Sequence, residues 1–156
     1  MKRLAVLLAT SGGAGYTPIA PGTAGSAVGV VIYLLTYRLA VVVQIALVVV
    51  ISLIGVWAAD VAARHFGRDD PGQVVIDEVA GQLLTLLLTG VGWMGAVAGF
   101  FIFRVLDVIK PWPARRLEHL HGGLGIMADD LMVALYGNIL IRVLIVALAR
   151  VGLSGA

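Results

Sequence analysis

The sequence predicts an all-α fold: a small polytopic helical membrane protein built from helical hairpins, with its motif loops on one membrane face. Three observations support this prediction. The 156-residue chain is 60% hydrophobic and has a mean hydropathy of +1.03. Apolar runs at 39–58, 79–103 and 131–150 are each long enough to cross a hydrocarbon core of roughly 30 Å. All nine acidic residues lie between Asp60 and Asp130, and most of them stand beside the end of an apolar run.

The length indicates a single domain, which we place over residues 1–156. The N-terminus resembles the start of a signal peptide, because Lys2 and Arg3 precede an apolar stretch at 4–9. That stretch is short, and glycines follow it instead of a clear small-x-small cleavage site. We therefore expect a retained N-terminal segment, with cleavage as the alternative.

The next apolar segments predict a helical hairpin. The run at 28–37 is too short to cross a bilayer alone, and Arg38 separates it from the run at 39–58. We therefore expect the segments 26–37 and 39–58 to pair as two helices that turn at Arg38.

A second hairpin is predicted within 79–103, because Gly90, Gly92 and Gly95 interrupt this apolar run. One continuous span is the alternative that its length allows. With two hairpins, all the polar stretches of the chain reach the same side of the membrane. These stretches are 12–26, 59–78 and 104–130.

The basic residues favour the cytoplasm for that shared side, under the positive-inside rule. Lys2 and Arg3 precede the first polar stretch, and Arg38 marks the opposite turn. The two later stretches hold Arg64, Arg68, Arg104, Lys110, Arg115 and Arg116. The net charge of +2 is scattered along the chain, so no nucleic-acid partner is expected. The absence of cysteine excludes disulfides, thiolate metal ligands and a cysteine nucleophile.

Two acidic pairs, Asp77-Glu78 and Asp129-Asp130, stand at the start of apolar runs. Carboxylates in such places can satisfy the free N–H groups of a helix, and for each pair alone this capping role is the simpler interpretation. Two pairs in a chain with nine acidic residues favour a site, because clustered carboxylate oxygens suit hard cations such as Mg²⁺. Gly81, one turn after Asp77, would leave room for a close neighbour.

Arg104, Asp107 and Lys110 are spaced three apart at the end of an apolar run, so that neighbours lie one helical turn apart. A local ion pair at the membrane boundary is one interpretation. The other is a site in which Arg104 and Lys110 bind phosphate oxygens while Asp107 holds a metal ion. Pro111 predicts that the helix stops at Lys110, and Trp112 is typical of an interfacial anchor.

Two weaker motifs allow either a structural or a functional interpretation. Thr23 or Ser26 is expected either to cap the first apolar helix or to bind a phosphate there with the free N–H groups. His119 and His121 are expected to be solvated interfacial residues, with metal binding or proton transfer as the alternative.

Two further charged residues lie at or within apolar runs. Asp60 precedes Arg64 by one helical turn, which favours an ion pair over a metal ligand. Arg142 interrupts the last apolar run, where it either snorkels to the interface or marks the end of a short helix.

Four strings in the sequence, at 13–26, 69–81, 103–113 and 121–130, carry a resemblance. The most specific are Arg-x-x-Asp-x-x-Lys-Pro-Trp-Pro and Gly-Gly-x-Gly-Ile-Met-x-Asp-Asp. Together, and in this order, they resemble the phosphatidylglycerophosphatase A family from about Gly12 to Tyr136. Ala24 departs from the pattern, because an aromatic residue is expected there.

The resemblance implies a multi-pass enzyme of the bacterial inner membrane with its active site facing the cytoplasm. Its substrate would be the phospholipid phosphatidylglycerophosphate, which would lose its terminal phosphate to give phosphatidylglycerol with Mg²⁺. By position, the resemblance implies functional roles for Asp77, Glu78, Asp107, Lys110, Asp129 and Asp130. We expect the five carboxylates of this set to hold the metal. The residues expected to bind the substrate phosphate are Thr23, Ser26, Arg104 and Lys110.

Direct attack by metal-activated water is the most economical chemistry, since motifs for phosphocysteine, phosphohistidine and Asp-x-Asp-x-Thr phosphoaspartyl routes are absent. An aspartyl-phosphate intermediate stays open. The alternative function is a small ion- or proton-coupled transporter with carboxylate ion sites, which would place them at mid-span. A third possibility is a noncatalytic membrane subunit in which the acidic pairs are only caps.

Overall fold

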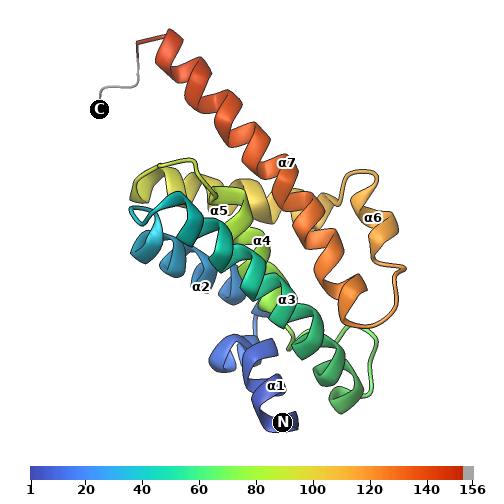
Figure 1. Cartoon of the computed structure of the whole chain (residues 1–156). Coiled ribbons are helices and arrows are strands. Elements are labelled where there is room, and N and C mark those ends of the chain that lie inside the picture. Colours follow the sequence, from blue (N-terminus) through green and yellow to red (C-terminus); the bar gives the residue numbers. More distant parts are fainter. Residues whose placement is uncertain (153–156) are drawn as a thin grey trace.

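The computed structural model describes residues 1–152, and over these residues the chain is helical with no strand (Figure 1). The elements follow the chain from a short N-terminal helix to a long C-terminal one. They are α1 (Lys2–Ala9), the 3₁₀ helix η1 (Ser11–Tyr16), α2 (Pro21–Thr36), α3 (Val41–Phe66), α4 (Ile76–Leu86), α5 (Trp93–Ile109), α6 (Ala114–Leu117) and α7 (Gly123–Arg150).

The first predicted hairpin is confirmed, with α2 and α3 joined by a turn that contains Arg38. α3 continues beyond the predicted end at residue 58 and stops at Gly67, which adopts the left-handed conformation that often terminates helices. The second helix of this hairpin is therefore longer than the predicted segment 39–58. Asp60 lies inside α3, and its carboxylate is 2.6 Å from the guanidinium of Arg64, which confirms their predicted ion pair.

The second hairpin is also confirmed, because α4 and α5 are separate helices. The chain turns through Gly90, which has a φ of 65°, and Gly92, which precedes the first residue of α5. Gly95 was wrongly included in the break, since it lies inside α5. The 11 residues of α4 rise only about 16 Å at 1.5 Å each, so this helix is too short to cross a bilayer.

α7 begins at Gly123, well before the apolar run predicted at 131–150. Asp129 and Asp130 consequently lie in its second turn, and the interpretation of this pair as N-terminal caps was wrong. The early start places both carboxylates on a fixed helical surface, where neighbouring residues point about 100° apart.

α3 and α7 are long and apolar enough to cross a membrane. Only 17% of the most apolar window of α3 is buried, and only 22% of that of α7. A core helix of a soluble protein would be mostly buried, whereas these helices expose large side chains such as Val42, Leu53 and Ile139. The chain is thus a helical membrane protein.

α4 lies at the centre of the bundle and contacts α2, α3, α5 and α7 (Figure 1). Glycines allow the closest of these approaches. Gly25 and Gly29 of α2 lie against Val75 and Gln82, where a Cβ atom on either glycine would come within 3 Å of a neighbouring atom. Gly81 leaves room for the ring of Phe103, which confirms its predicted role as a point of close contact.

The structure explains Arg142. α7 continues to Arg150, so Arg142 does not mark the end of a short helix. Its guanidinium donates hydrogen bonds to the carbonyls of Leu87, at 3.0 Å, and Leu88, at 3.3 Å. Asn138 donates to the carbonyl of Leu87 as well, at 2.9 Å. These side chains satisfy the free carbonyls at the end of α4, for which a membrane would offer no water.

Candidate active site

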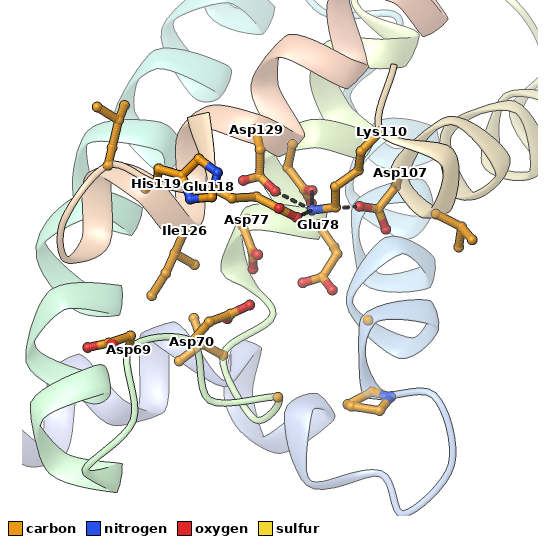
Figure 2. A pocket seen from close by; sticks show the side chains of 18 of the residues that line it. Asp69, Asp70, Asp77, Glu78, Asp107, Lys110, Glu118, His119, Ile126 and Asp129 are labelled. Carbon is orange, nitrogen blue, oxygen red and sulfur yellow. Dashed lines mark hydrogen bonds and ion pairs between the residues drawn. The ribbon is translucent and has the colours of Figure 1, made fainter. Parts of the chain in front are cut away.

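One polar cavity of about 830 Å³ lies where four helices end, at the start of α2, α4 and α7 and at the end of α5 (Figure 2). Residues from all three predicted polar stretches meet there, as two helical hairpins require. The charged residues and histidines that line it are Asp69, Asp70, Asp77, Glu78, Arg104, Asp107, Lys110, Glu118, His119, His121, Asp129 and Asp130.

Three carboxylates form the deepest part of the site. Asp77 and Glu78 stand in the first turn of α4, and Asp130 approaches them from α7. One oxygen of each lies within 4.8 Å of the others. Asp77 Oδ1, Glu78 Oε2 and Asp130 Oδ2 are buried without a hydrogen-bond partner among the described residues. Buried carboxylate oxygens without partners are costly, so this acidic trio has the chemistry of a site for a hard cation.

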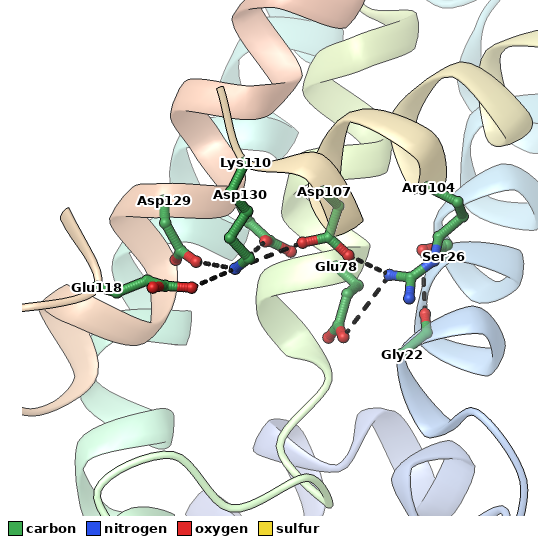
Figure 3. Close-up of polar contacts among 9 residues, drawn as sticks. All are labelled: Gly22, Ser26, Glu78, Arg104, Asp107, Lys110, Glu118, Asp129 and Asp130. Carbon is green, nitrogen blue, oxygen red and sulfur yellow. Dashed lines mark hydrogen bonds and ion pairs between the residues drawn. The ribbon is translucent and has the colours of Figure 1, made fainter. Parts of the chain in front are cut away.

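Arg104 lies beside the trio, between the end of α5 and the start of α2 (Figure 3). Its Nη1 atom is 2.6 Å from Asp107 Oδ2 and 3.9 Å from Glu78 Oε1. Gly22 makes this arrangement possible, because a Cβ atom there would collide with the Glu78 carboxylate and lie 3.2 Å from Arg104 Nη1. Asp107 thus holds the Arg104 guanidinium in place. The sequence analysis expected Asp107 among five metal ligands, but it lies outside the acidic trio.

α5 stops before Pro111, as predicted, and Lys110 follows its last residue in a left-handed conformation with a φ of 45°, where residues before a proline more often adopt an extended one. Its ammonium donates a hydrogen bond to Asp129. Its Nζ atom also lies 3.5 Å from Asp107 Oδ1 and 3.2 Å from Glu118 Oε1 (Figure 3). One ammonium group thus contacts several carboxylates. Burial alone would lower the pKa of Lys110, but the bond to Asp129 and the nearby negative charges outweigh it and raise the pKa above its usual value.

The cavity brings together all six residues for which the sequence predicted catalytic roles, together with Arg104. Thr23 and Ser26 do not line it. Neither residue caps α2, because the helix begins at Pro21 after Ala20 without a side-chain cap, so that prediction was wrong. Ser26 is fully buried and donates its hydroxyl to the carbonyl of Gly22, at 3.0 Å.

Three carboxylates that the sequence analysis did not propose also line the cavity: Asp69, Asp70 and Glu118. Asp70 lies on the loop between α3 and α4 and faces the cavity (Figure 2). Burial raises the pKa of its carboxyl, while the charge of Lys110 opposes that shift. The position of Asp69 and Asp70 inside one of the four recognised strings was the signal that could have identified them.

The fold and the site define a class of protein: a small helical membrane enzyme whose carboxylates and cations share one cavity at the helix ends. The chain belongs to the phosphatidylglycerophosphatase A family, whose family model matches residues 7–145. The enzyme is therefore a phosphatase. The cavity lies at helix ends and not at mid-span, which disfavours the transporter alternative.

Two of three relatives carry the name of this family. The Escherichia coli K12 phosphatidylglycerophosphatase A is 40% identical over 128 residues, 81% of this chain and 74% of its own. The Haemophilus influenzae protein of the same name is 33% identical, over 86% of this chain and 85% of its own. A Bacteroides thetaiotaomicron protein, provisionally named a phosphatidylinositol-3-phosphatase, is 37% identical over 92% of this chain and 96% of its own. No solved structure has significant similarity to the chain.

Proposed function

We propose that this phosphatase hydrolyses the terminal phosphate of phosphatidylglycerophosphate, using Mg²⁺, to give phosphatidylglycerol. In the reaction, a water oxygen forms a bond to phosphorus and the P–O bond to the glycerol headgroup breaks. The glycerol oxygen takes up the proton that the water gives up, so the products are phosphatidylglycerol and inorganic phosphate. The family and two of its named relatives support this substrate.

The observation that carries the proposal is the pairing of opposite charges in one cavity. The acidic trio Asp77, Glu78 and Asp130 lies beside two cations, Arg104 and Lys110. A phosphomonoester carries two negative charges and needs positive partners. Carboxylates alone would repel it. A site that contains both kinds of group suits a phosphate bound together with a metal ion.

The acidic trio fits Mg²⁺. Its oxygens are close to one another, and one buried oxygen of each residue has no hydrogen-bond donor among the described residues. Mg²⁺ prefers carboxylate oxygens and keeps several waters, for which the cavity has room. When bound, the ion would polarise the phosphoryl oxygens and lower the pKa of a bound water.

Residues of the chain would make the other contacts to the substrate phosphate. Arg104 is fixed by Asp107 and presents a planar fork of donors that matches phosphate oxygens. Lys110 is a compact point charge whose raised pKa keeps it protonated at neutral pH. Both would bind and orient the phosphate, and Asp129 would position Lys110 through their hydrogen bond.

We also propose that the cavity faces the cytoplasm in a bacterial inner membrane and that the chain crosses this membrane several times. Of the 11 basic residues, only Arg38, Arg142 and Arg150 lie at or toward the opposite ends of the helices. The positive-inside rule favours the cytoplasm for the basic side.

A headgroup comparison tests the substrate. The purified protein should release phosphate from phosphatidylglycerophosphate faster than from phosphatidylinositol 3-phosphate, the lipid suggested by the name of the Bacteroides relative. Both lipids should be presented in the same detergent with Mg²⁺. Preference for the inositol lipid would overturn the proposed substrate, while phosphatase activity itself would stand.

A further inference from the structure

The cavity has two chemically different rims. On one side it is lined mainly by polar residues of loops, including Asp69, His119 and His121, with Leu120 between the two histidines. On the other side, its lining consists of Ala20 to Gly22 at the start of α2 and Val108 in the last turn of α5. A polar and an apolar rim around one opening are expected where a cavity meets both water and lipid.

Two apolar side chains at this rim are largely exposed. Ile19, next to Ala20, has 82% of its surface exposed, and Val108 has 78%. Within the described residues these side chains face outward, although Val108 also lines the polar cavity. Apolar side chains beside a polar cavity in a membrane protein are stabilised when lipid chains cover them.

Aromatic residues place this rim near the membrane surface. Trp112 follows α5 and is 72% exposed, with the guanidinium of Arg116 lying 5.7 Å from its ring centre. Tyr16, which precedes Ile19, is 57% exposed. Exposed Trp and Tyr side chains concentrate at the level of lipid headgroups. The opening between the start of α2 and the end of α5 therefore lies at headgroup depth.

Arg104 stands just inside this opening. It projects between α5 and α2, where Gly22 leaves room for it (Figure 3). Its side chain is 21% exposed, so it is accessible to a ligand from the rim. An anionic headgroup that enters from the lipid side would meet this guanidinium before it reaches the acidic trio.

We propose that the opening between Ala20–Gly22 and Val108 is a lateral portal through which the lipid substrate enters from the bilayer. In the bound state the phosphate lies in the cavity, while the acyl chains stay in the membrane against Ile19 and Val108. The portal rests on the proposed function, because it requires a lipid phosphomonoester as substrate. Its occupant is the acyl region of that same lipid.

Paired serine variants test the portal. The double variant Ile19→Ser, Val108→Ser should raise KM for long-chain phosphatidylglycerophosphate in vesicles by at least about fivefold, because apolar contact with the chains is lost. Its KM for a short-chain dihexanoyl analogue, presented as monomers, should stay near that of the wild type. The matched control is Leu35→Ser, Val97→Ser, which removes exposed apolar residues of α2 and α5 that do not line the cavity. An equal change for both substrates, or no change for either, would overturn the portal.

A second measurement does not depend on turnover. Because the chain has no cysteine, Val108→Cys and His119→Cys can each carry a single fluorescent label. In vesicles with brominated acyl chains, the label at Val108 should be quenched strongly and that at His119 weakly. Equal quenching would overturn the portal even if the enzyme is active. Strong quenching at Val108 without phosphate release would instead support the lipid-facing rim and contradict the proposed substrate.

Discussion

Lys110 at the end of α5 donates a hydrogen bond to Asp129 in the second turn of α7. The next residue, Asp130, belongs instead to the acidic trio with Asp77 and Glu78. Each of these adjacent carboxylates keeps one buried oxygen without a hydrogen-bond donor among the described residues. They differ in their contact with Lys110, because Asp129 accepts its hydrogen bond whereas Asp130 Oδ1 lies 3.8 Å from its Nζ atom.

This difference predicts that the two aspartates act at different steps. Asp130→Asn should raise the Mg²⁺ concentration needed for half-maximal activity at least tenfold, about 1.4 kcal/mol, because a proposed metal ligand loses its charge. Asp129→Asn should lower kcat with a smaller effect on the Mg²⁺ requirement, because it frees Lys110. Sequence alone had assigned metal binding to Asp129 as well. Phosphate release measured across a Mg²⁺ titration separates the two, and the reverse pattern would contradict this assignment.

The burial of Asp70 predicts that the stability of the protein depends on pH. Burial raises the pKa of its carboxyl in the folded state, so the folded protein holds this proton more tightly than the unfolded chain does. The free energy of unfolding should therefore fall as pH rises from the unfolded pKa, about 3.9, through the folded value. Asp70→Asn should be more stable than the wild type at pH 7, and the difference should shrink in acid. Thermal unfolding in detergent at several pH values measures it, and a less stable variant at pH 7 would refute the prediction.

The hairpins, and the meeting of the six predicted residues in one cavity, could be predicted from the sequence, but the contacts that each residue makes could not. Gly90 and Gly92 interrupt an apolar run, and a turn there is a local property of the chain. The start of α7 was missed because Gly123 and Gly125 suggest a loop. Their helical conformation depends on packing, since a Cβ atom at Gly123 would collide with the carbonyl of Val56 in α3. No local pattern reveals such a contact.

Substitution of Asn138 is expected to lower the stability of the protein without changing its catalysis. It donates to the carbonyls of Leu84 and Thr85, both at 3.1 Å, as well as to Leu87. Asn138→Leu should lower stability by about 1–3 kcal/mol, because carbonyls at the end of α4 lose their donor in an apolar region. The kcat of the folded fraction should be unchanged. Ile139→Ala, on the exposed side of the same helix, is the control and should have a smaller effect on stability. A loss of kcat with normal stability would point to another role for Asn138.

Membrane orientation can be tested with single cysteines, because the chain has none of its own. Arg68→Cys precedes α4, and Arg115→Cys lies in α6, so the hairpins place both at the end of the molecule that holds the cavity. Both should resist an impermeant thiol reagent added outside intact cells and react after the cells are opened. Labelling of one site but not the other in intact cells would rule out a shared face.

The central claim, a metal-dependent lipid phosphatase built on the acidic trio, is tested most directly by phosphate release from phosphatidylglycerophosphate in detergent. Purified protein should be active with excess Mg²⁺, lose activity in EDTA, and recover it when Mg²⁺ is restored. Asp77→Asn should remain folded but show little recovery at the Mg²⁺ concentration that restores the wild type. Undiminished activity in EDTA, or full recovery by Asp77→Asn at that concentration, would contradict the claim.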